Sequence, residues 1–298
     1  MSSSSMSATW REIFIGMRPR HFAKNILVFA PVVFAQHIGH LAHVSKSVAA
    51  FALFCGLSGA GYLLNDVVDR EGDRLHQVKA DRPVAADRLS IRAALTASAA
   101  LYAASLFLAF LLNRHFGWAA LAYVAISVGY SLGLKNIVIV DLFTVAAGYV
   151  LRVVAGAAVI SVEISSWLLI CAMLLSLFIA LSKRSLEIRV LQDDAVGHRK
   201  TLAEYNPHLL DQMTAVITSA LLVAYTLYTR SPETIWKFGT GDLAYTVPFV
   251  LYGIFRYLYL VHVKEGYHTL EQVLVTDKPM IINLFLYAVV VAWALYRH

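Results

Sequence analysis

Cysteine and charge are both scarce in this sequence, and each scarcity excludes a class of protein. The 298 residues include two cysteines, Cys55 and Cys171. Both lie inside apolar runs, so they are interpreted as small apolar residues and a disulfide framework is excluded. Charged residues make up only 15% of the chain, against about 25% in soluble domains. Residues 1–7 lack the basic segment and apolar core of a secretory signal, and we predict a disordered tail there.

Long apolar runs take the place of charge, since 59% of the residues are hydrophobic. The runs are about 18 to 24 residues long, which is enough to cross a bilayer as a helix. We therefore predict an all-α, polytopic membrane protein with one domain over residues 1–298. It is expected to be a bundle of nine transmembrane helices with cytoplasmic cap loops after helices 2 and 6. The predicted spans are residues 22–37, 46–66, 90–112, 115–132, 137–160, 165–182, 210–229, 243–262 and 279–296.

Lysine and arginine gather in the polar segments of one side of this predicted bundle. They cluster before residue 25, in the loop from 70 to 88 and in the segment from 183 to 200, whereas the opposite side carries few. The positive-inside rule places the N-terminus and these loops in the cytoplasm. The formal net charge of +6 then concentrates on one face, where it suits membrane lipids and anionic substrates and does not indicate nucleic acid.

An acidic segment follows the second predicted span. On a helix, Asn65, Asp66, Asp69 and Asp73 share one face. Like charges at this spacing repel unless a cation joins them. Mg²⁺ is the natural candidate, because it prefers oxygen ligands and is commonly shared between carboxylates and substrate phosphates. A solvated acidic loop is the alternative interpretation.

Cations frame this segment. Trp10, Ile13, Phe14 and Met17 repeat at helical spacing, which predicts an interfacial amphipathic helix over residues 8–20. Arg20, Lys24 and Asn25 follow at its end, and two interpretations weigh evenly: a positive-inside signal alone, or a group of side chains facing a polyanion. In the next loop, Arg74 and Arg82 offer guanidinium groups, which grip phosphate as a bidentate fork.

Other polar residues lie at or inside the predicted spans. A link of a few residues after Tyr130 fixes Lys135 at the cytoplasmic boundary, and Asp141 is a functional candidate because it is ionisable within a span. Arg152 lies about 16 Å deeper than Asp141 on the same helix, so a structural ion pair is the favoured interpretation. Arg256 is unassigned. The glycines around Ser58 predict close helix packing, with room for a substrate beside Asp66.

The sixth predicted span ends in a cationic segment. Lys183 and Glu187 are spaced to pair on a helix, which would leave Arg184 to point elsewhere.

Taken together, these features resemble the UbiA-type superfamily of intramembrane prenyltransferases over nearly the whole chain. Asn65, Asp66, Asp69 and Asp73 reproduce its NDxxDxxxD signature. The second aspartate-rich motif, usual after the sixth helix, is replaced here by a segment containing Lys183, Arg184 and Glu187. This departure is similar to the branch of decaprenyl-phosphate phosphoribosyltransferases. The supporting matches are Arg18-Pro19-Arg20 with Lys24-Asn25, Tyr130 to Lys135, Arg152 with Ala155-Gly156, Lys183-Arg184 with Glu187, and Arg199 to Leu202 with Tyr205.

The resemblance implies a Mg²⁺-dependent enzyme of the bacterial inner (cytoplasmic) membrane, with its N-terminus and active site cytoplasmic. It would transfer 5-phosphoribose from phosphoribosyl diphosphate to a polyprenyl (decaprenyl-type) phosphate and release diphosphate, on the way to cell-wall arabinan. The oligomeric state stays open, a homo-oligomer included.

The implied residue roles fall into three groups. Catalysis would involve Asp66, Asp69, Lys24 and Lys135. Mg²⁺ would be held by Asn65, Asp66, Asp69 and Asp73. Substrate binding would involve Arg20, Lys24, Asn25, Asn65, Arg74, Arg82, Tyr130, Lys135, Asp141, Lys183, Arg184 and Glu187. Two rival functions are prenyl transfer from a prenyl diphosphate to an aromatic acceptor, and a non-enzymatic transporter or lipid-binding scaffold.

Overall fold

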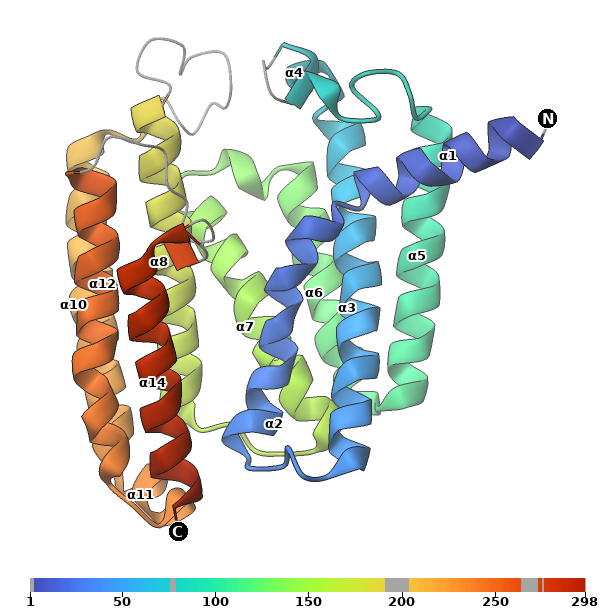
Figure 1. Ribbon diagram of the computed structural model, residues 1–298. Helices are drawn as coiled ribbons and strands as arrows, with labels where there is room; N and C mark the ends of the chain where they lie inside the picture. Colours follow the sequence, from blue (N-terminus) through green and yellow to red (C-terminus); the bar gives the residue numbers. More distant parts are fainter. Residues whose placement is uncertain (1–2, 76–78, 191–203, 264–272, 275, 298) are drawn as a thin grey trace. The chain divides into compact units, whose positions relative to one another are not determined.

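The computed structural model describes residues 3–75, 79–190, 204–263, 273–274 and 276–297 (Figure 1). All regular secondary structure in these residues is helical. The described chain forms two compact units, which divide between Ile164 and Ser165. Unit 1 holds the described residues up to Ile164, and unit 2 holds those from Ser165 onward. The prediction of one domain over residues 1–298 stays a prediction.

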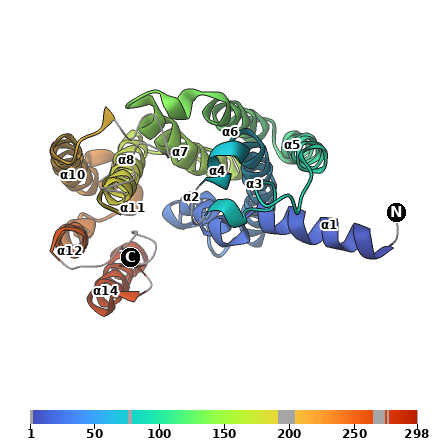
Figure 2. The same cartoon turned by 90° about the horizontal axis from the view of Figure 1, so that it is seen from above.

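Unit 1 is built around four long helices that stand side by side (Figures 1 and 2). Its elements are α1 (Ser3–Gly16), the 3₁₀ helix η1 (Pro19–Phe29), α2 (Ala30–Phe34), α3 (Leu41–Val68), α4 (Arg70–Arg74), η2 (Lys79–Asp81), α5 (Ile91–Leu112), α6 (Arg114–Leu132), η3 (Leu134–Asn136) and α7 (Val140–Ile160). Its core joins residues from η1, α3, α6 and α7, among them Val28, Phe54, Phe116 and Val159.

Glycines allow close contact at two places in this core. On α3, a Cβ added at Gly59 would lie 2.8 Å from the Met17 side chain, and one added at Gly61 would lie 2.6 Å from Ser127 Oγ. On α7, a Cβ at Gly156 would lie 2.1 Å from the carbonyl oxygen of Val28. The predicted close packing is therefore confirmed. The room predicted for a substrate is filled at Gly59 and Gly61 by the chain's own side chains.

The N-terminal segment departs from the predicted helix over residues 8–20. α1 begins at Ser3 and ends at Gly16, because Arg18 takes the left-handed conformation, with φ 55° and ψ 67°. Pro19 follows it, and proline disfavours the right-handed helical conformation in the preceding residue. The exposed Trp10 and Phe14 retain the character of an interfacial helix.

The first predicted span, residues 22–37, is not one α-helix. The chain runs through η1 and then through the short α2, which ends at Phe34. Pro31 lies in the first turn of α2, where a missing N–H costs no helical hydrogen bond.

Unit 2 consists of α8 (Ser166–Val190), α10 (Pro207–Arg230), α11 (Pro232–Phe238), the 3₁₀ helix η5 (Asp242–Thr246), α12 (Val247–His262) and α14 (Lys278–Tyr296). The starts of α10 and α14 are capped: Asn206 Oδ1 accepts from the Leu209 N–H, and Asp277 Oδ1 accepts from the Met280 N–H. Such caps satisfy donors that have no partner within the helix.

Seven helical segments in the described part of the chain are long and apolar enough to cross a membrane. They are Leu41–Val68, Ile91–Leu112, Val140–Ile160, Ser166–Ile188, Pro207–Arg230, Asp242–His262 and Lys278–Tyr296. These correspond to seven of the nine predicted spans, and a multi-pass membrane protein is confirmed. Of the other two, residues 115–132 are helical in α6, and residues 22–37 form the broken segment described above. The count of nine and the two cap loops stay predictions.

Candidate functional site

The acidic residues of unit 1 lie where α3 gives way to α4. The two helices follow each other so closely that the backbone keeps helical spacing: the Asp69 N–H bonds to the Asn65 carbonyl and the Asp73 N–H to the Asp69 carbonyl, both at 2.8 Å. Asn65 Nδ2 donates to Asp69 Oδ2 at 2.8 Å. The four side chains of the signature, which we call the acidic cluster, thus follow the helical spacing that the sequence predicts.

Two arginines neutralise the inner carboxylates. Asp66 is 1% exposed and accepts a hydrogen bond from Arg18. Arg82 Nη1 lies 2.5 Å from Asp73 Oδ2 and 3.4 Å from Asp66 Oδ1. Arg82 therefore bridges Asp66 and Asp73.

Lys135 neutralises the outer part of the acidic cluster. It lies in η3, between α6 and α7, and is 5% exposed. Its Nζ donates to Asn65 Oδ1 at 3.1 Å and also to Asp69. Residues 70 positions apart in the sequence are thus brought together.

One carboxylate oxygen in the acidic cluster has no hydrogen-bond donor. Asp66 Oδ2 is buried and makes no hydrogen bond in the described structure. No group of three or more His, Cys, Asp or Glu side chains among the described residues is arranged to hold a metal by itself. Mg²⁺, however, commonly takes one or two carboxylates and completes its shell with water and substrate phosphates. The oxygen donors of the acidic cluster fit that mode of binding.

The loop after α4 is fixed by its own ion pairs. Arg70 Nη2 donates to Asp87 Oδ1 at 2.7 Å, and Arg74 donates to the other oxygen of the same carboxylate. Arg74 Nε also donates to the Ala85 carbonyl at 3.1 Å. The hydrogen bond from Arg70 is the largest influence that holds the pKa of Asp87 below its ordinary value. Arg74, predicted to bind substrate, is here engaged in shaping the loop.

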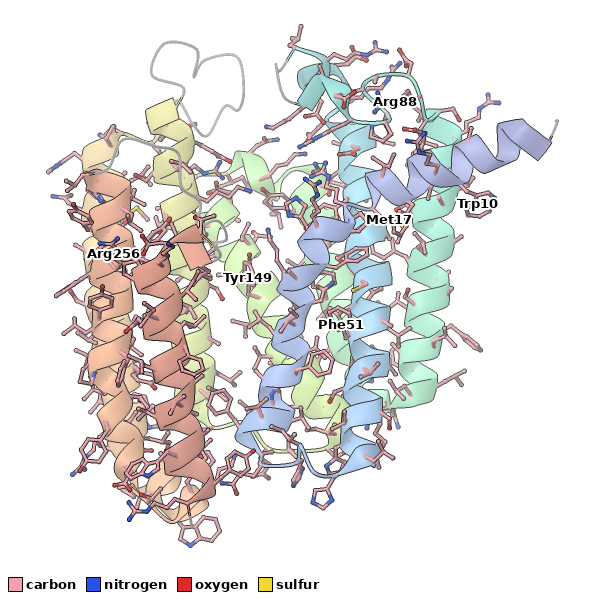
Figure 3. All side chains as sticks on the ribbon, viewed as in Figure 1. Trp10, Met17, Phe51, Arg88, Tyr149 and Arg256 are labelled. Atoms are coloured by element: carbon pink, nitrogen blue, oxygen red, sulfur yellow. The ribbon has the colours of Figure 1, made fainter. Side chains whose placement is uncertain are left out.

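Arg88 ties this loop to α1 (Figure 3). Its Nε donates to Glu12 Oε2 at 3.0 Å, and its Nη1 donates to Asp81 Oδ1 at 2.8 Å. The hydrogen bond with Asp81 raises the pKa of Arg88. α1 and the loop are therefore joined on the side of unit 1 that carries the acidic cluster.

Asn25 lies away from the acidic cluster, contrary to the polyanion-facing role considered for it. It is fully buried, donates to Ser58 Oγ at 3.1 Å, and accepts from Arg152 Nε at 2.7 Å. The predicted ion pair of Arg152 is also wrong: among the described residues its hydrogen-bond partners are the neutral Asn25, Gly148 and Tyr123. η1 packs against α7 at this depth, which buries Asn25 instead of exposing it.

The remaining predicted residues of unit 1 belong to three elements. Arg20 and Lys24 are in η1, Tyr130 is in the last turn of α6, and Asp141 is in the first turn of α7, where it is fully buried. Their roles as substrate-binding residues stay predictions.

Lys183, Arg184 and Glu187 lie in unit 2, on α8. Arg184 does not point elsewhere as predicted, since its Nη1 pairs with Glu187 Oε2 at 2.7 Å. The i,i+3 spacing of this pair is as favourable on a helix as the predicted i,i+4 spacing. The segment Arg199 to Leu202 lies outside the described residues. Arg256, which Figure 3 labels, gains a partner that the sequence did not indicate. Its guanidinium donates to both oxygens of Asp277, at 3.1 and 2.9 Å.

Sequence reasoning placed Arg18 at the cytoplasmic boundary but missed its contact with Asp66. Its guanidinium lies 4.9 Å from the ring centre of Tyr62 and pairs with Asp66. The signal was Pro19, because the residue before a proline avoids the right-handed helical conformation and the chain therefore turns at Arg18.

Comparison with known proteins places this architecture. The model of the UbiA prenyltransferase family matches residues 26–273. The chain belongs to the UbiA prenyltransferase family. The solved UbiA homolog from Archaeoglobus fulgidus, bound to GPP and Mg²⁺, has the same fold, with a TM-score of 0.71, 18% identity, and coverage of 95% of this chain and 98% of that one. The UbiA homolog from Aeropyrum pernix K1 gives a TM-score of 0.65 at 19% identity over 92% and 98% of the two chains.

Two curated relatives of this UbiA family member share one name. The decaprenyl-phosphate phosphoribosyltransferase of Corynebacterium glutamicum is 34% identical over 71% of this chain and 65% of its own length. The protein of the same name from Mycobacterium tuberculosis strain H37Rv is 29% identical over 80% of this chain and 81% of its own length. The match thus spans just under two thirds of the Corynebacterium protein.

Proposed function

We propose that this UbiA family protein transfers 5-phosphoribose from phosphoribosyl diphosphate to a polyprenyl phosphate and releases diphosphate. The observation that carries the proposal is the acidic cluster, in which two buried carboxylates and the half-buried Asp69 are matched by Arg18, Arg82 and Lys135. The names of the two curated relatives support the choice of a phosphoribosyl donor and a decaprenyl-type acceptor.

The residues that would hold Mg²⁺ are Asn65, Asp66, Asp69 and Asp73. Two observations support this assignment. The first is that Asp66 Oδ2 is buried and accepts no hydrogen bond in the described structure. The second is the Archaeoglobus homolog, whose solved structure is bound to both GPP and Mg²⁺. When bound, Mg²⁺ would offset the charge that develops on the departing diphosphate.

The chain's own cations would do the rest of the electrostatic work. Lys135, Lys24 and Arg82 are proposed to surround the diphosphate, with Arg20 at the edge. As the bond between ribose C1 and the diphosphate oxygen lengthens, its electron pair passes to that oxygen and the ribose becomes oxocarbenium-like. Fixed positive groups stabilise such a transition state more than the ground state.

The acceptor needs no strong base from the protein, because a phosphate monoester is already anionic near neutral pH. An oxygen of the lipid phosphate forms the new bond to C1 on the face opposite the leaving group, so the product has inverted configuration. Positioning of the two substrates then supplies much of the rate.

Specificity for a phosphorylated donor is assigned in this proposal to Lys183 and Arg184. Lys183 and Arg184 stand on α8 where prenyl-transferring members of the family usually have acidic residues, and cations bind an additional phosphate directly. We further propose that the protein works in the bacterial inner membrane with this site facing the cytoplasm, and that its product leads to cell-wall arabinan.

A labelling experiment separates this function from its rivals. Membranes that contain the protein are incubated with Mg²⁺ and labelled phosphoribosyl diphosphate, with and without a polyprenyl phosphate. The proposal predicts a lipid-extractable labelled product that Asp66→Asn and Asp69→Asn abolish. Product formed only from a prenyl diphosphate and an aromatic acid would support the aromatic prenyltransferase instead. Transport that persists in both variants, with no transferase activity, would support a transporter.

A further inference from the structure

Arg152 carries a positive charge in the middle of α7 without a matching acid. Its side chain is 6% exposed, and no Asp or Glu among the described residues forms an ion pair with it. Burying a charge is costly unless a charge of opposite sign joins it. On α12 of unit 2, the less buried Arg256 forms an ion pair with Asp277. Arg152 therefore has an unfilled requirement for an anion.

The hydrogen bonds of Arg152 leave two donors available. A guanidinium has five N–H groups. Nε donates to Asn25 Oδ1 at 2.7 Å, Nη1 to the Gly148 carbonyl at 2.7 Å, and Nη2 to the Tyr123 hydroxyl at 3.0 Å. One N–H remains on each terminal nitrogen. Two such N–H groups on neighbouring nitrogens are what an oxyanion uses in bidentate binding.

The surroundings hold the guanidinium in place. Its carbon lies 4.8 Å from the ring centre of Tyr123 and 5.7 Å from that of Tyr149, which Figure 3 shows on α7. Asn25 is in turn fixed by Ser58. A ring face favours a cation, so the two tyrosines orient the charge without neutralising it.

Two further features favour an anion here. Lys24 directly precedes Asn25 in η1, so a second positive charge is carried by the segment that holds Arg152. Gly148 leaves one flank of the guanidinium without a side chain: a Cβ built there would meet Nη1 at 3.6 Å as its nearest neighbour.

We propose that Arg152, with Tyr123, binds a phosphate monoester inside unit 1. Ser58, which adjoins Asn25, lies eight residues before Asp66 on α3, or about 12 Å along the helix axis. The anchor is thus separate from the acidic cluster. Its identity rests on the proposed function, in which both substrates carry a phosphate monoester: the 5-phosphate of the donor and the phosphate of the acceptor lipid.

The test measures binding without turnover. Purified protein in lipid nanodiscs with Mg²⁺ is titrated separately with ribose 5-phosphate and with farnesyl phosphate, and thermal stabilisation is recorded. Arg152→Met should weaken binding of one of these ligands at least tenfold, and Arg152→Lys, which keeps the charge but loses the fork, about fivefold. Arg256→Met is the matched control: it should unfold at lower temperature but bind both ligands with wild-type affinity.

Each outcome of the titrations has one interpretation. A loss confined to ribose 5-phosphate identifies the donor's phosphate, and a loss confined to farnesyl phosphate identifies the acceptor's; either supports the proposal. Wild-type affinity for both ligands in Arg152→Met, or in Arg152→Lys if the methionine variant does not fold, overturns it and leaves a structural cation.

Turnover then separates this inference from the proposed function. Arg152-dependent binding of ribose 5-phosphate in a protein that transfers no phosphoribose would uphold the inference and refute the function. Normal phosphoribose transfer by Arg152→Lys, with unchanged KM for both substrates, would uphold the proposed function and refute the inference about Arg152.

Discussion

Replacing Lys135 by methionine should separate metal affinity from catalysis. In the structure Lys135 is almost fully buried and occupies the oxygens of Asn65 and Asp69 that are proposed to hold Mg²⁺. Methionine has a similar length and can lie in the same space without a charge. The variant therefore removes a cation that competes with the metal and also assists the leaving diphosphate.

The two effects have opposite signs. Two unit charges near 4 Å interact by about 4 kcal/mol at an effective dielectric constant of 20. The Asp69 side chain is 26% exposed, and screening together with desolvation reduces the net value to about 1–2 kcal/mol. Loss of this competition should strengthen Mg²⁺ binding by the substrate-free protein about 5- to 30-fold. Loss of one preorganised donor should lower kcat about 10²- to 10³-fold.

The assay pairs a metal titration with steady-state kinetics. Mg²⁺-dependent thermal stabilisation gives metal affinity without substrate, and release of labelled diphosphate gives kcat. Lys237→Met, in α11 of unit 2, is the control for removal of a membrane-protein lysine and should change neither quantity. A Lys135→Met variant with wild-type kcat, or with weaker Mg²⁺ binding, would refute the reasoning.

Three further predictions concern the rest of unit 1. Arg82→Leu leaves Asp66 and Asp73 without their bridge, so kcat/KM should fall at least tenfold, measured against Arg92→Leu, and unchanged activity would contradict the bridge. Because the pKa of Asp87 is depressed, its stabilisation of the loop is present above its unfolded pKa of about 3.9 and is lost as pH falls through the lower folded pKa. In the wild type, proteolysis within residues 79–90 should therefore increase as pH falls through that acidic window, whereas in Asp87→Asn it should be high at every pH. Identical pH profiles for the two proteins would count against the ion pairs. Gly156→Ala forces a Cβ against the Val28 carbonyl, so it should cost about 1–3 kcal/mol of stability and lower the Tm. In the control variant Gly72→Ala the added Cβ meets no atom within 4 Å, so the Tm should stay the same or rise. Equal Tm values for the two variants would refute the close contact.

Local pattern predicted the acidic cluster well. The spacing of Asn65, Asp66, Asp69 and Asp73 survives the change from α3 to α4, because the backbone hydrogen bonds continue across it. Run length predicted the seven helices that are long enough to span a membrane. It overestimated residues 22–37, where a 3₁₀ helix packs against α7 at Gly156.

Contacts between residues distant in the sequence could not be predicted from local spacing. The contact of Arg18 with Asp66 depends on a left-handed backbone residue, and the burial of Asn25 depends on how η1 meets α7. For Arg152, depth alone suggested a carboxylate partner, whereas the structure gives it hydrogen bonds to the neutral Asn25 and Tyr123. Such choices arise from tertiary packing, which one sequence does not display.

The central claim is tested most directly by following both halves of the donor in one reaction. Purified protein in nanodiscs is given polyprenyl phosphate, Mg²⁺ and phosphoribosyl diphosphate labelled separately in the ribose and in the diphosphate. We predict that ribose label enters the lipid fraction in a one-to-one ratio with released diphosphate, and that Asp66→Asn abolishes both. Release of diphosphate without ribose in the lipid, or no consumption of this donor alongside consumption of a prenyl diphosphate, would contradict the proposed function.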